Sequence, residues 1–202
     1  AGILVCDSQN LADRLHYIQN AVGASLGAID SWLVLRGIQT LAIRVKRQQE
    51  SALKIANWLS ANPKISNVFY PGLKNHPGYA ISVRQASGFG GMISFEVSQE
   101  AGGEQFAQHI LEHVKLIQFA ESLGGTESLI TYPTTQTHGA IPEEERIARG
   151  ITGRLLRLSI GLENPDDLIA DLAQAMGDAF SAKDAFNFDT IIDRKGTGSL
   201  KY

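Results

Sequence analysis

The stretch Arg154-Leu155-Leu156-Arg157-Leu158-Ser159-Ile160-Gly161 sets one arginine in the middle of an apolar strand. Side chains alternate between the faces of a strand, so Leu156, Leu158 and Ile160 face one side and Arg157 and Ser159 the other. A guanidinium between leucines loses hydration and needs an anion, and its parallel N–H groups match a carboxylate. That carboxylate can belong to an Asp or Glu of the fold or to a ligand, and the strand pattern leaves both open.

A glycine-containing loop lies upstream, in Ala120-Glu121-Ser122-Leu123-Gly124-Gly125-Thr126-Glu127-Ser128-Leu129. Its serine offers a hydroxyl, and the two glycines leave the backbone unobstructed, as at sites where a ligand approaches the main chain closely. The alternative is an ordinary turn from a strand into a helix.

Predicted helices and strands alternate along the rest of the chain. Strands are expected at residues 3–5, 65–70, 92–97, 116–120 and 154–160. Helices are expected from the cap Ser8 to Gly23, from Ser31 to the Asn62-Pro63 stop, at 104–114, at 142–150, and from the cap Asn164 to Gly177. This mixture predicts an α/β fold with a sheet and helices packed on one side.

Composition narrows the class of protein. The 202 residues include 44% hydrophobic and 19% charged residues with a net charge of −3, which is typical of a soluble globular protein. Basic residues are scattered, so no nucleic-acid surface is predicted, and neither a membrane span nor a signal peptide is expected. The lone Cys6 excludes an internal disulfide. A reducing cytoplasm is the expected location.

The arginine strand and the Glu-Ser-Leu-Gly-Gly loop are two of a longer series of short motifs, which follow one another along most of the chain in the order found in one known family. Together these segments resemble the cystathionine (Cys/Met metabolism) family of pyridoxal-phosphate trans-sulfuration enzymes, which includes cystathionine γ-synthases, β-lyases and γ-lyases. The resemblance runs from residue 1 to about residue 180. The matching segments are residues 1–5, 18–24, 30–41, 70–73, 88–95, 120–129, 137–138, 154–163 and 167–168.

The resemblance implies a fold and a division into domains. The fold would be the C-terminal part of a fold-type-I enzyme, α/β, whose small domain has a mostly antiparallel sheet packed by helices. Residues 1–45 would end the large cofactor domain and link it to a small domain at 46–181. Residues 182–202 would be a tail or a fusion junction. Their sequence weakly resembles the N-terminus of an aminotransferase-like C–S lyase, and a disordered polar extension is the alternative.

The resemblance also assigns substrate-binding residues. Arg157 would hold the α-carboxylate of a small amino-acid substrate, assisted by Ser122 and the backbone N–H of Leu123. Glu121 would lie near the distal arm of the substrate, and Thr137 would line the same pocket.

Pyridoxal 5'-phosphate is the cofactor that the resemblance implies. The family's Schiff-base lysine would precede Ala1, so no catalytic or cofactor-binding residue is expected in this chain, and the isolated chain is expected to be inactive without its N-terminal part.

Cleavage of the C–S bond of cystathionine or a related thioether by β- or γ-elimination is the first expectation. The alternatives are γ-replacement on an activated homoserine and a non-catalytic assembly module. Gln136 stands where many members carry Met, which leaves substrate preference open. Family members are homotetramers.

One short motif points elsewhere. His109-Ile110-Leu111-Glu112-His113 fits the His-x-x-Glu-His pattern of inverted zinc peptidases, with two histidines on one helix face. A solvated helix face is the alternative, and no metal site is predicted here.

Overall fold

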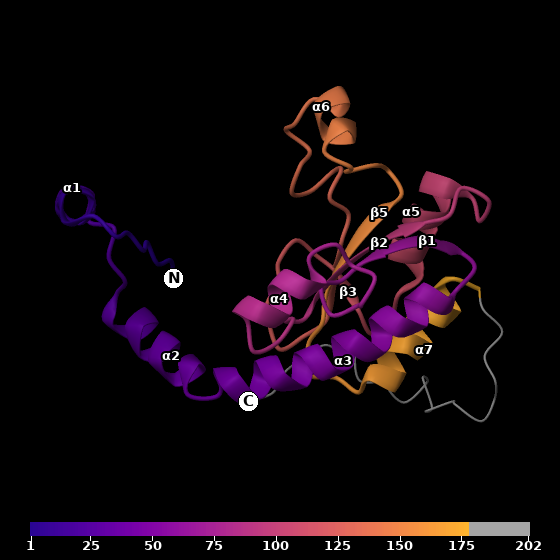
Figure 1. Cartoon of the computed structure of the whole chain (residues 1–202), viewed down its shortest axis with the longest axis horizontal. Coiled ribbons are helices and arrows are strands. Elements are labelled where there is room, and N and C mark those ends of the chain that lie inside the picture. Colours follow the sequence, from indigo (N-terminus) through magenta and orange to yellow (C-terminus); the bar gives the residue numbers. More distant parts are fainter. Residues whose placement is uncertain (178–202) are drawn as a thin grey trace, which may run out of the picture. The chain divides into compact units, whose positions relative to one another are not determined.

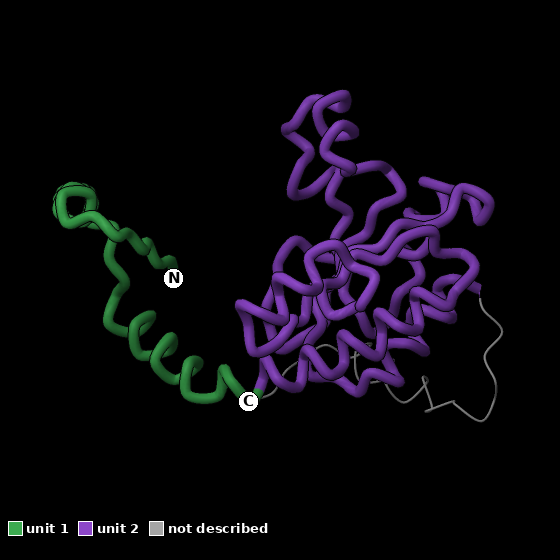
Figure 2. The backbone as a smooth tube through the Cα atoms, in the orientation of Figure 1, with its two compact units in different colours: residues 1–43 green, residues 44–202 purple. Residues whose placement is uncertain are grey.

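The computed structural model describes residues 1–177 and divides the chain into two compact units. The first comprises Ala1–Ile43, and the second begins at Arg44 (Figure 2). The assignment of residues 1–45 to a cofactor domain remains a prediction. The predicted tail, residues 182–202, lies outside the described residues.

The first unit contains two helices, α1 (Gln9–Val22) and α2 (Ala28–Ile38). The predicted cap at the start of α1 is confirmed, since Ser8 Oγ accepts a hydrogen bond from the backbone N–H of Leu11. Gly23 ends α1 with φ of 74°, a conformation that glycine adopts without strain. The strand predicted at residues 3–5 is wrong. Its three side chains are 78–91% exposed, and no described strand pairs with this segment.

The single long helix predicted from Ser31 is two helices, because α2 ends at Ile38 and α3 spans Leu41–Ala61. Thr40 explains the break. Its backbone N–H and its hydroxyl both donate to the carbonyl of Gly37, each at 3.4 Å, so a tight turn replaces the regular helical bond. The predicted end of the helix before Asn62 is confirmed.

The second unit contains a five-stranded sheet in the order β1-β2-β5-β4-β3 (Figure 1). All pairs are antiparallel except β3 with β4. The strands are β1 (Ile65–Phe69), β2 (Met92–Val97), β3 (Gln118–Phe119), β4 (Leu129–Thr131) and β5 (Leu155–Ser159). The sequence did not predict β4, because three residues are too few to show a strand period. The α/β fold class with a mostly antiparallel sheet is confirmed.

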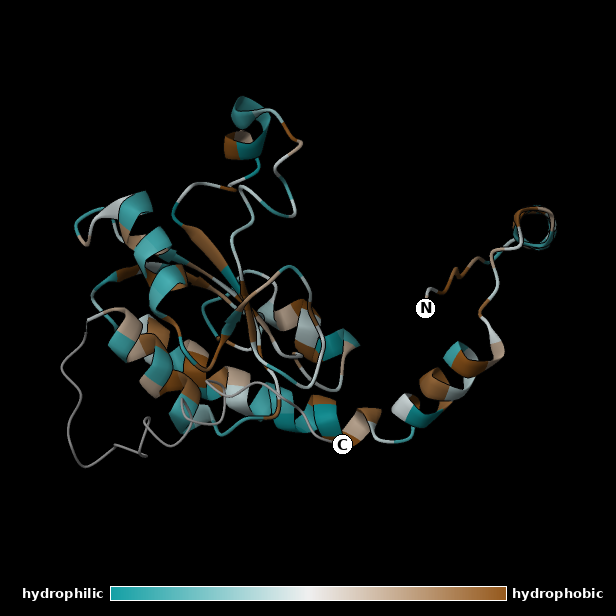
Figure 3. Ribbon diagram, turned by 180° about the vertical axis from the view of Figure 1, so that it is seen from behind, coloured by the Kyte–Doolittle hydropathy of each residue, from teal (hydrophilic) through white to brown (hydrophobic). Residues whose placement is uncertain are grey.

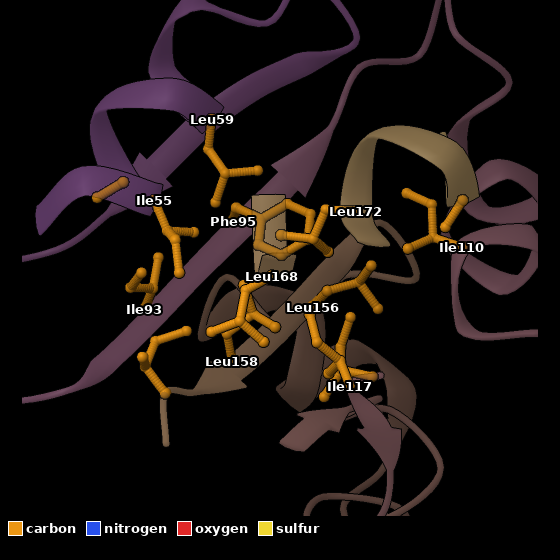
Figure 4. Packing of buried hydrophobic residues seen from close by; sticks show 14 of the residues in the cluster. Ile55, Leu59, Ile93, Phe95, Ile110, Ile117, Leu156, Leu158, Leu168 and Leu172 are labelled. Atoms are coloured by element: carbon orange, nitrogen blue, oxygen red, sulfur yellow. The ribbon is translucent and has the colours of Figure 1, made fainter. Parts of the chain in front are cut away.

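Helices α3, α5 (Gly103–His113) and α7 (Pro165–Ala175) pack on one face of the sheet, as predicted. Figure 4 shows Ile55 and Leu59 of α3, Ile110 of α5 and two leucines of α7 against the strands. The sheet residues in this core include Ile93, Phe95, Leu156 and Leu158, all fully buried. The opposite face of β5 is therefore the face that carries Arg157.

Two short helices contribute no buried residues: α4 (Tyr79–Gln85), which the sequence did not predict, and α6 (Glu143–Ala148), which it did. The sequence features that predicted α6 are Pro142 before its first residue and Gly150 just past its end. Among residues 1–177, no helix combines the length and the apolar character that crossing a bilayer requires.

A buried carboxylate connects the helical layer to the sheet. Asp171 of α7 is fully buried and accepts hydrogen bonds at 2.7–2.8 Å from the backbone N–H groups of Lys115, Leu116 and Ile117. These residues join α5 to β3 and precede the loop that faces Arg157. Asp171 therefore fixes this connection through contacts distant in sequence.

Candidate functional site

Arg157 lies in the middle of a polar row across the sheet. Its direct partners are Ser94 of β2 and Thr131 of β4. Leu156 and Leu158, on either side of Arg157, are fully buried among the helices on the other face (Figure 4). The predicted alternation along β5 is confirmed, and it leaves the arginine half-buried on the face that the helices do not cover.

The guanidinium of Arg157 contacts neutral groups. One Nη donates to the carbonyl of Ser122 at 3.2 Å and to the hydroxyl of Thr131 at 3.1 Å. Its Nε is buried and has no hydrogen-bond partner within residues 1–177. No Asp or Glu of the described chain forms an ion pair with it. A positively charged group with an unsatisfied buried donor favours an anion supplied from outside the described fold.

Arg154, three residues earlier, shows the other arrangement. Its guanidinium lies 3.9 Å from a carboxylate oxygen of Glu96 and also donates to the carbonyl of Val97. Glu96 is buried and accepts further hydrogen bonds from Asn67 and Thr152. The strand pattern left open whether an Asp or Glu of the fold pairs with Arg157. The structure shows such a carboxylate beside Arg154 instead, and Arg157 has none among the described residues.

The Ser-Leu-Gly-Gly loop lies against the outward residues of β5. Besides the bond from Arg157 to Ser122, the N–H of Gly124 donates to Ser159 Oγ at 2.8 Å. Gly124 has φ of 74°, which a residue with a Cβ rarely adopts, so the loop shape depends on this glycine. Residues 120–128 connect β3 to β4 and lead into no helix. The structure thus brings the two motifs into direct contact.

The far end of the loop is fixed by a second set of bonds. The carboxylate of Glu163 accepts from both the N–H and the hydroxyl of Ser128 at 2.7 Å, and Ser128 Oγ accepts from the N–H of Gly161. A Cβ at Gly161 would lie 2.4 Å from the carbonyl oxygen of Thr126, so only glycine permits this approach. Ser159 at the end of β5 therefore holds the middle of the loop, and the residues just after β5 hold its far end.

Helix α3 adds a third attachment, since Gln48 donates to the carbonyl of Gly125 at 2.7 Å. Sequence reasoning did not identify Gln48, Ser128 or Thr131 as positioning residues. No local pattern indicates them, because their partners lie 26–77 residues away along the chain. Ser159 could be recognised as a candidate positioning residue from the sequence only because it lies on the same strand face as Arg157.

The other predicted site residues form no hydrogen bond with Arg157 among the described residues, and Ser122 contacts it through its backbone carbonyl alone. Glu121, Ser122 and Leu123 are exposed, and the N–H of Leu123 has no acceptor among the described residues. The hydroxyl of Thr137 lies 2.7 Å from Nδ1 of His138, and no hydrogen bond joins it to Arg157. The structure therefore brings Arg157 together with the segment around Ser122, and no hydrogen bond joins the side chain of Glu121 or Thr137 to the arginine among the described residues.

The zinc-peptidase motif lies on α5, where His109, Glu112 and His113 are exposed. A hydrolytic zinc centre needs three protein ligands. Within residues 1–177, no three His, Cys, Asp or Glu side chains are grouped to hold a metal ion. The described residues do not assemble the site of a zinc peptidase.

Comparison with known proteins gives consistent matches. The family model described as Cys/Met metabolism PLP-dependent enzyme matches residues 1–177. Cystathionine gamma-synthase of Haemophilus influenzae is 50% identical over 174 residues, which are 86% of this chain and 42% of that protein. Cystathionine gamma-lyase of Bacillus subtilis is 44% identical, with 87% and 45% covered. Cystathionine beta-lyase of Lactococcus lactis is 46% identical, with 87% and 45% covered.

Solved structures agree in fold. The crystal structure of cystathionine gamma-lyase from Lactobacillus plantarum complexed with L-serine superposes with a TM-score of 0.79 at 41% identity, covering 86% of this chain and 44% of that one. The chain spans less than half the length of the curated relatives it matches. Because the family model covers most of this sequence, the chain belongs to the Cys/Met metabolism family of PLP-dependent enzymes.

Proposed function

We propose that this chain is the C-terminal part of an enzyme that cleaves the C–S bond of cystathionine or a related thioether amino acid by β- or γ-elimination. Relatives named cystathionine gamma-lyase and cystathionine beta-lyase support this proposal at 44% and 46% identity. We place the whole enzyme in the cytoplasm as a homotetramer, the assembly that the sequence resemblance implied.

The guanidinium of Arg157, which has no carboxylate partner and an unsatisfied Nε among the described residues, is the observation that carries the proposal. A thioether amino acid carries an α-carboxylate, and the fork of Arg157 can bind its two oxygens in parallel. The unsatisfied Nε of Arg157 would gain its missing acceptor there. The free N–H of Leu123 and the exposed hydroxyl of Ser122 would donate to the same group. Glu121 would face the distal amino group, and Thr137 would complete the pocket.

Pyridoxal 5'-phosphate is the cofactor of the family and, when bound, acts as an electron sink. The donors around Arg157 fit a substrate carboxylate and include no amine for a Schiff base. Lys54 and Lys64 are held by Asp166 and by the carbonyl of Met176. We propose, as the sequence resemblance implied, that the attachment lysine precedes Ala1, and that this chain orients the substrate.

A second candidate is γ-replacement, in which cysteine and an activated homoserine form cystathionine. The 50% identity to the Haemophilus influenzae cystathionine gamma-synthase favours it. Both reactions begin with an amino acid whose α-carboxylate must be held, so Arg157 has the same role in each.

The proposal is tested with a chimaera, in which this chain is joined to the part of the Bacillus subtilis cystathionine gamma-lyase that this chain does not match. The chimaera should release pyruvate or 2-oxobutyrate from cystathionine, and this chain alone should release neither. Arg157→Lys should lower kcat/KM by about 100-fold, because a single ammonium cannot reproduce the fork and the substrate is misplaced.

Arg154→Lys is the matched control. Arg154 precedes the same strand and binds Glu96 within the fold, so its replacement should affect stability and leave kcat/KM unchanged. Equal losses in both variants, or a chimaera that binds the cofactor and converts neither cystathionine nor an activated homoserine, would contradict the proposal.

A further inference from the structure

The exposed side of α5 carries two histidines one helical turn apart. The rings of His109 and His113 stack with centroids 3.8 Å apart and planes inclined by 27°. We propose that this pair forms a two-ligand site for a divalent late first-row transition-metal ion, with Zn²⁺ and Cu²⁺ as the probes. The site is separate from the proposed substrate end and does not depend on the proposed function.

The hydrogen bond of His113 engages one ring nitrogen and leaves the other, Nε2, available to bind a metal ion. Its Nδ1 lies 2.8 Å from the carbonyl oxygen of His109. A carbonyl only accepts, so Nδ1 carries the hydrogen and the lone pair is on Nε2. Metal-binding histidines commonly donate their second N–H to a backbone carbonyl in this way, which fixes both the tautomer and the ring orientation.

The helix itself is held rigidly in place. Its opposite face is buried in the core through Ala107, Ile110 and Leu111. Its last turn is also attached to α7, since Gln174 Nε2 donates to the carbonyl of His113 at 2.6 Å. Residues at i and i+4 have Cβ atoms about 5–6 Å apart, a span that one metal ion can bridge with two imidazoles. The backbone positions of the two histidines are therefore fixed by the packing of α5 and by the bond from α7.

The composition of the pair sets the class of metal. Imidazole ligands suit zinc, copper and nickel and are poor ligands for magnesium or calcium. No third side chain of the described region joins the histidines, so water would complete the coordination. The inferred site is accordingly one of binding, which distinguishes it from the peptidase centre suggested by the sequence motif.

The experiment uses the 202-residue chain, without an affinity tag, carrying Cys6→Ser. This background removes a competing thiol that lines a hollow with His16 in the first unit. Substoichiometric Cu²⁺ should broaden the backbone amide resonances of residues 106–116 before any others. Calorimetric titration with Zn²⁺ should give one ion per chain. His109→Ala and His113→Ala should each weaken binding by at least about tenfold, the usual lower cost of disturbing a metal site.

Two variants serve as controls for the histidine pair. His76→Ala should leave affinity unchanged, because no histidine lies three or four residues from His76 in the sequence and its Nδ1 accepts from the N–H of Gly78. Glu112→Gln should also leave it unchanged, because the proposed ligands are the two imidazoles. Both histidines are exposed, so their variants should keep the fold of the parent, which the unchanged amide shifts of the strands in the core would show. Broadening that begins elsewhere, affinity that survives His113→Ala, or no binding at millimolar ion would overturn the proposal.

Discussion

The two units of the chain differ in how their apolar residues are covered. In the first unit neither α1 nor α2 contains a buried residue, and Ile29, Trp32 and Leu35 are 60–74% exposed. Figure 3 shows hydrophobic residues along α2. In the second unit α3, α5 and α7 each bury a face against the sheet. Both units have regular helices, but only the second has a core.

This difference separates two sources of helix stability. A cap and a terminal glycine are local and can define the ends of α1 without any tertiary contact. Most helical stability in proteins nevertheless comes from packing an apolar face, and short helices are marginal without it. The apolar side chains of the first unit have no such cover within the described residues. Variants in the two units should therefore have different consequences.

The largest effect is expected from truncating a leucine in the core. Leu158→Ala should lower the free energy of unfolding by about 2–5 kcal/mol, because Leu158 is fully buried and its removal leaves a cavity. The matched substitution Leu35→Ala, at a residue 65% exposed, should change it by less than about 0.5 kcal/mol. Urea unfolding of both variants measures the contrast. Similar losses would show that α2 is buried after all.

The next effect concerns the buried carboxylate. Asp171→Ala should destabilise the second unit by about 2–4 kcal/mol, because three backbone N–H groups lose their acceptor. Asp166→Ala on the same helix is the control, since its ion pair with Lys54 is exposed and should contribute less than about 1 kcal/mol. Thermal unfolding distinguishes the two. Equal shifts in midpoint would refute a structural role for the Asp171 bonds.

The smallest effect compares equivalent caps in the two units. Ser8 Oγ accepts from Leu11 N–H at α1, and Asn164 Oδ1 accepts from Asp166 N–H at α7. Each replacement by alanine should cost about 1 kcal/mol. Asn164→Ala should lower global stability, whereas Ser8→Ala should only accelerate amide hydrogen exchange within α1, because that helix has no buried contacts. A global loss in Ser8→Ala would show that the first unit is coupled to the core.

Many elements of both units could be predicted from local patterns. The alternation in Arg154–Ile160, the caps at Ser8 and Asn164, and the Pro142 and Gly150 boundaries of α6 all appear in the structure. Periodicity failed where elements were short or interrupted, as in β4, in α4, and at the turn before α3. It also failed at residues 3–5, because an apolar run cannot show whether a neighbouring strand is available.

The sequence by itself determined the helix caps, the alternating faces of β5 and the motifs by which the family was recognised. These are local properties of a few consecutive residues, and short-range sterics and hydrogen bonding specify them. Only the tertiary structure decided that Arg154 is paired with Glu96 while Arg157 keeps a free donor beside the Ser122 loop. That distinction depends on which strands lie next to β5, since the partners of both arginines come from distant parts of the chain.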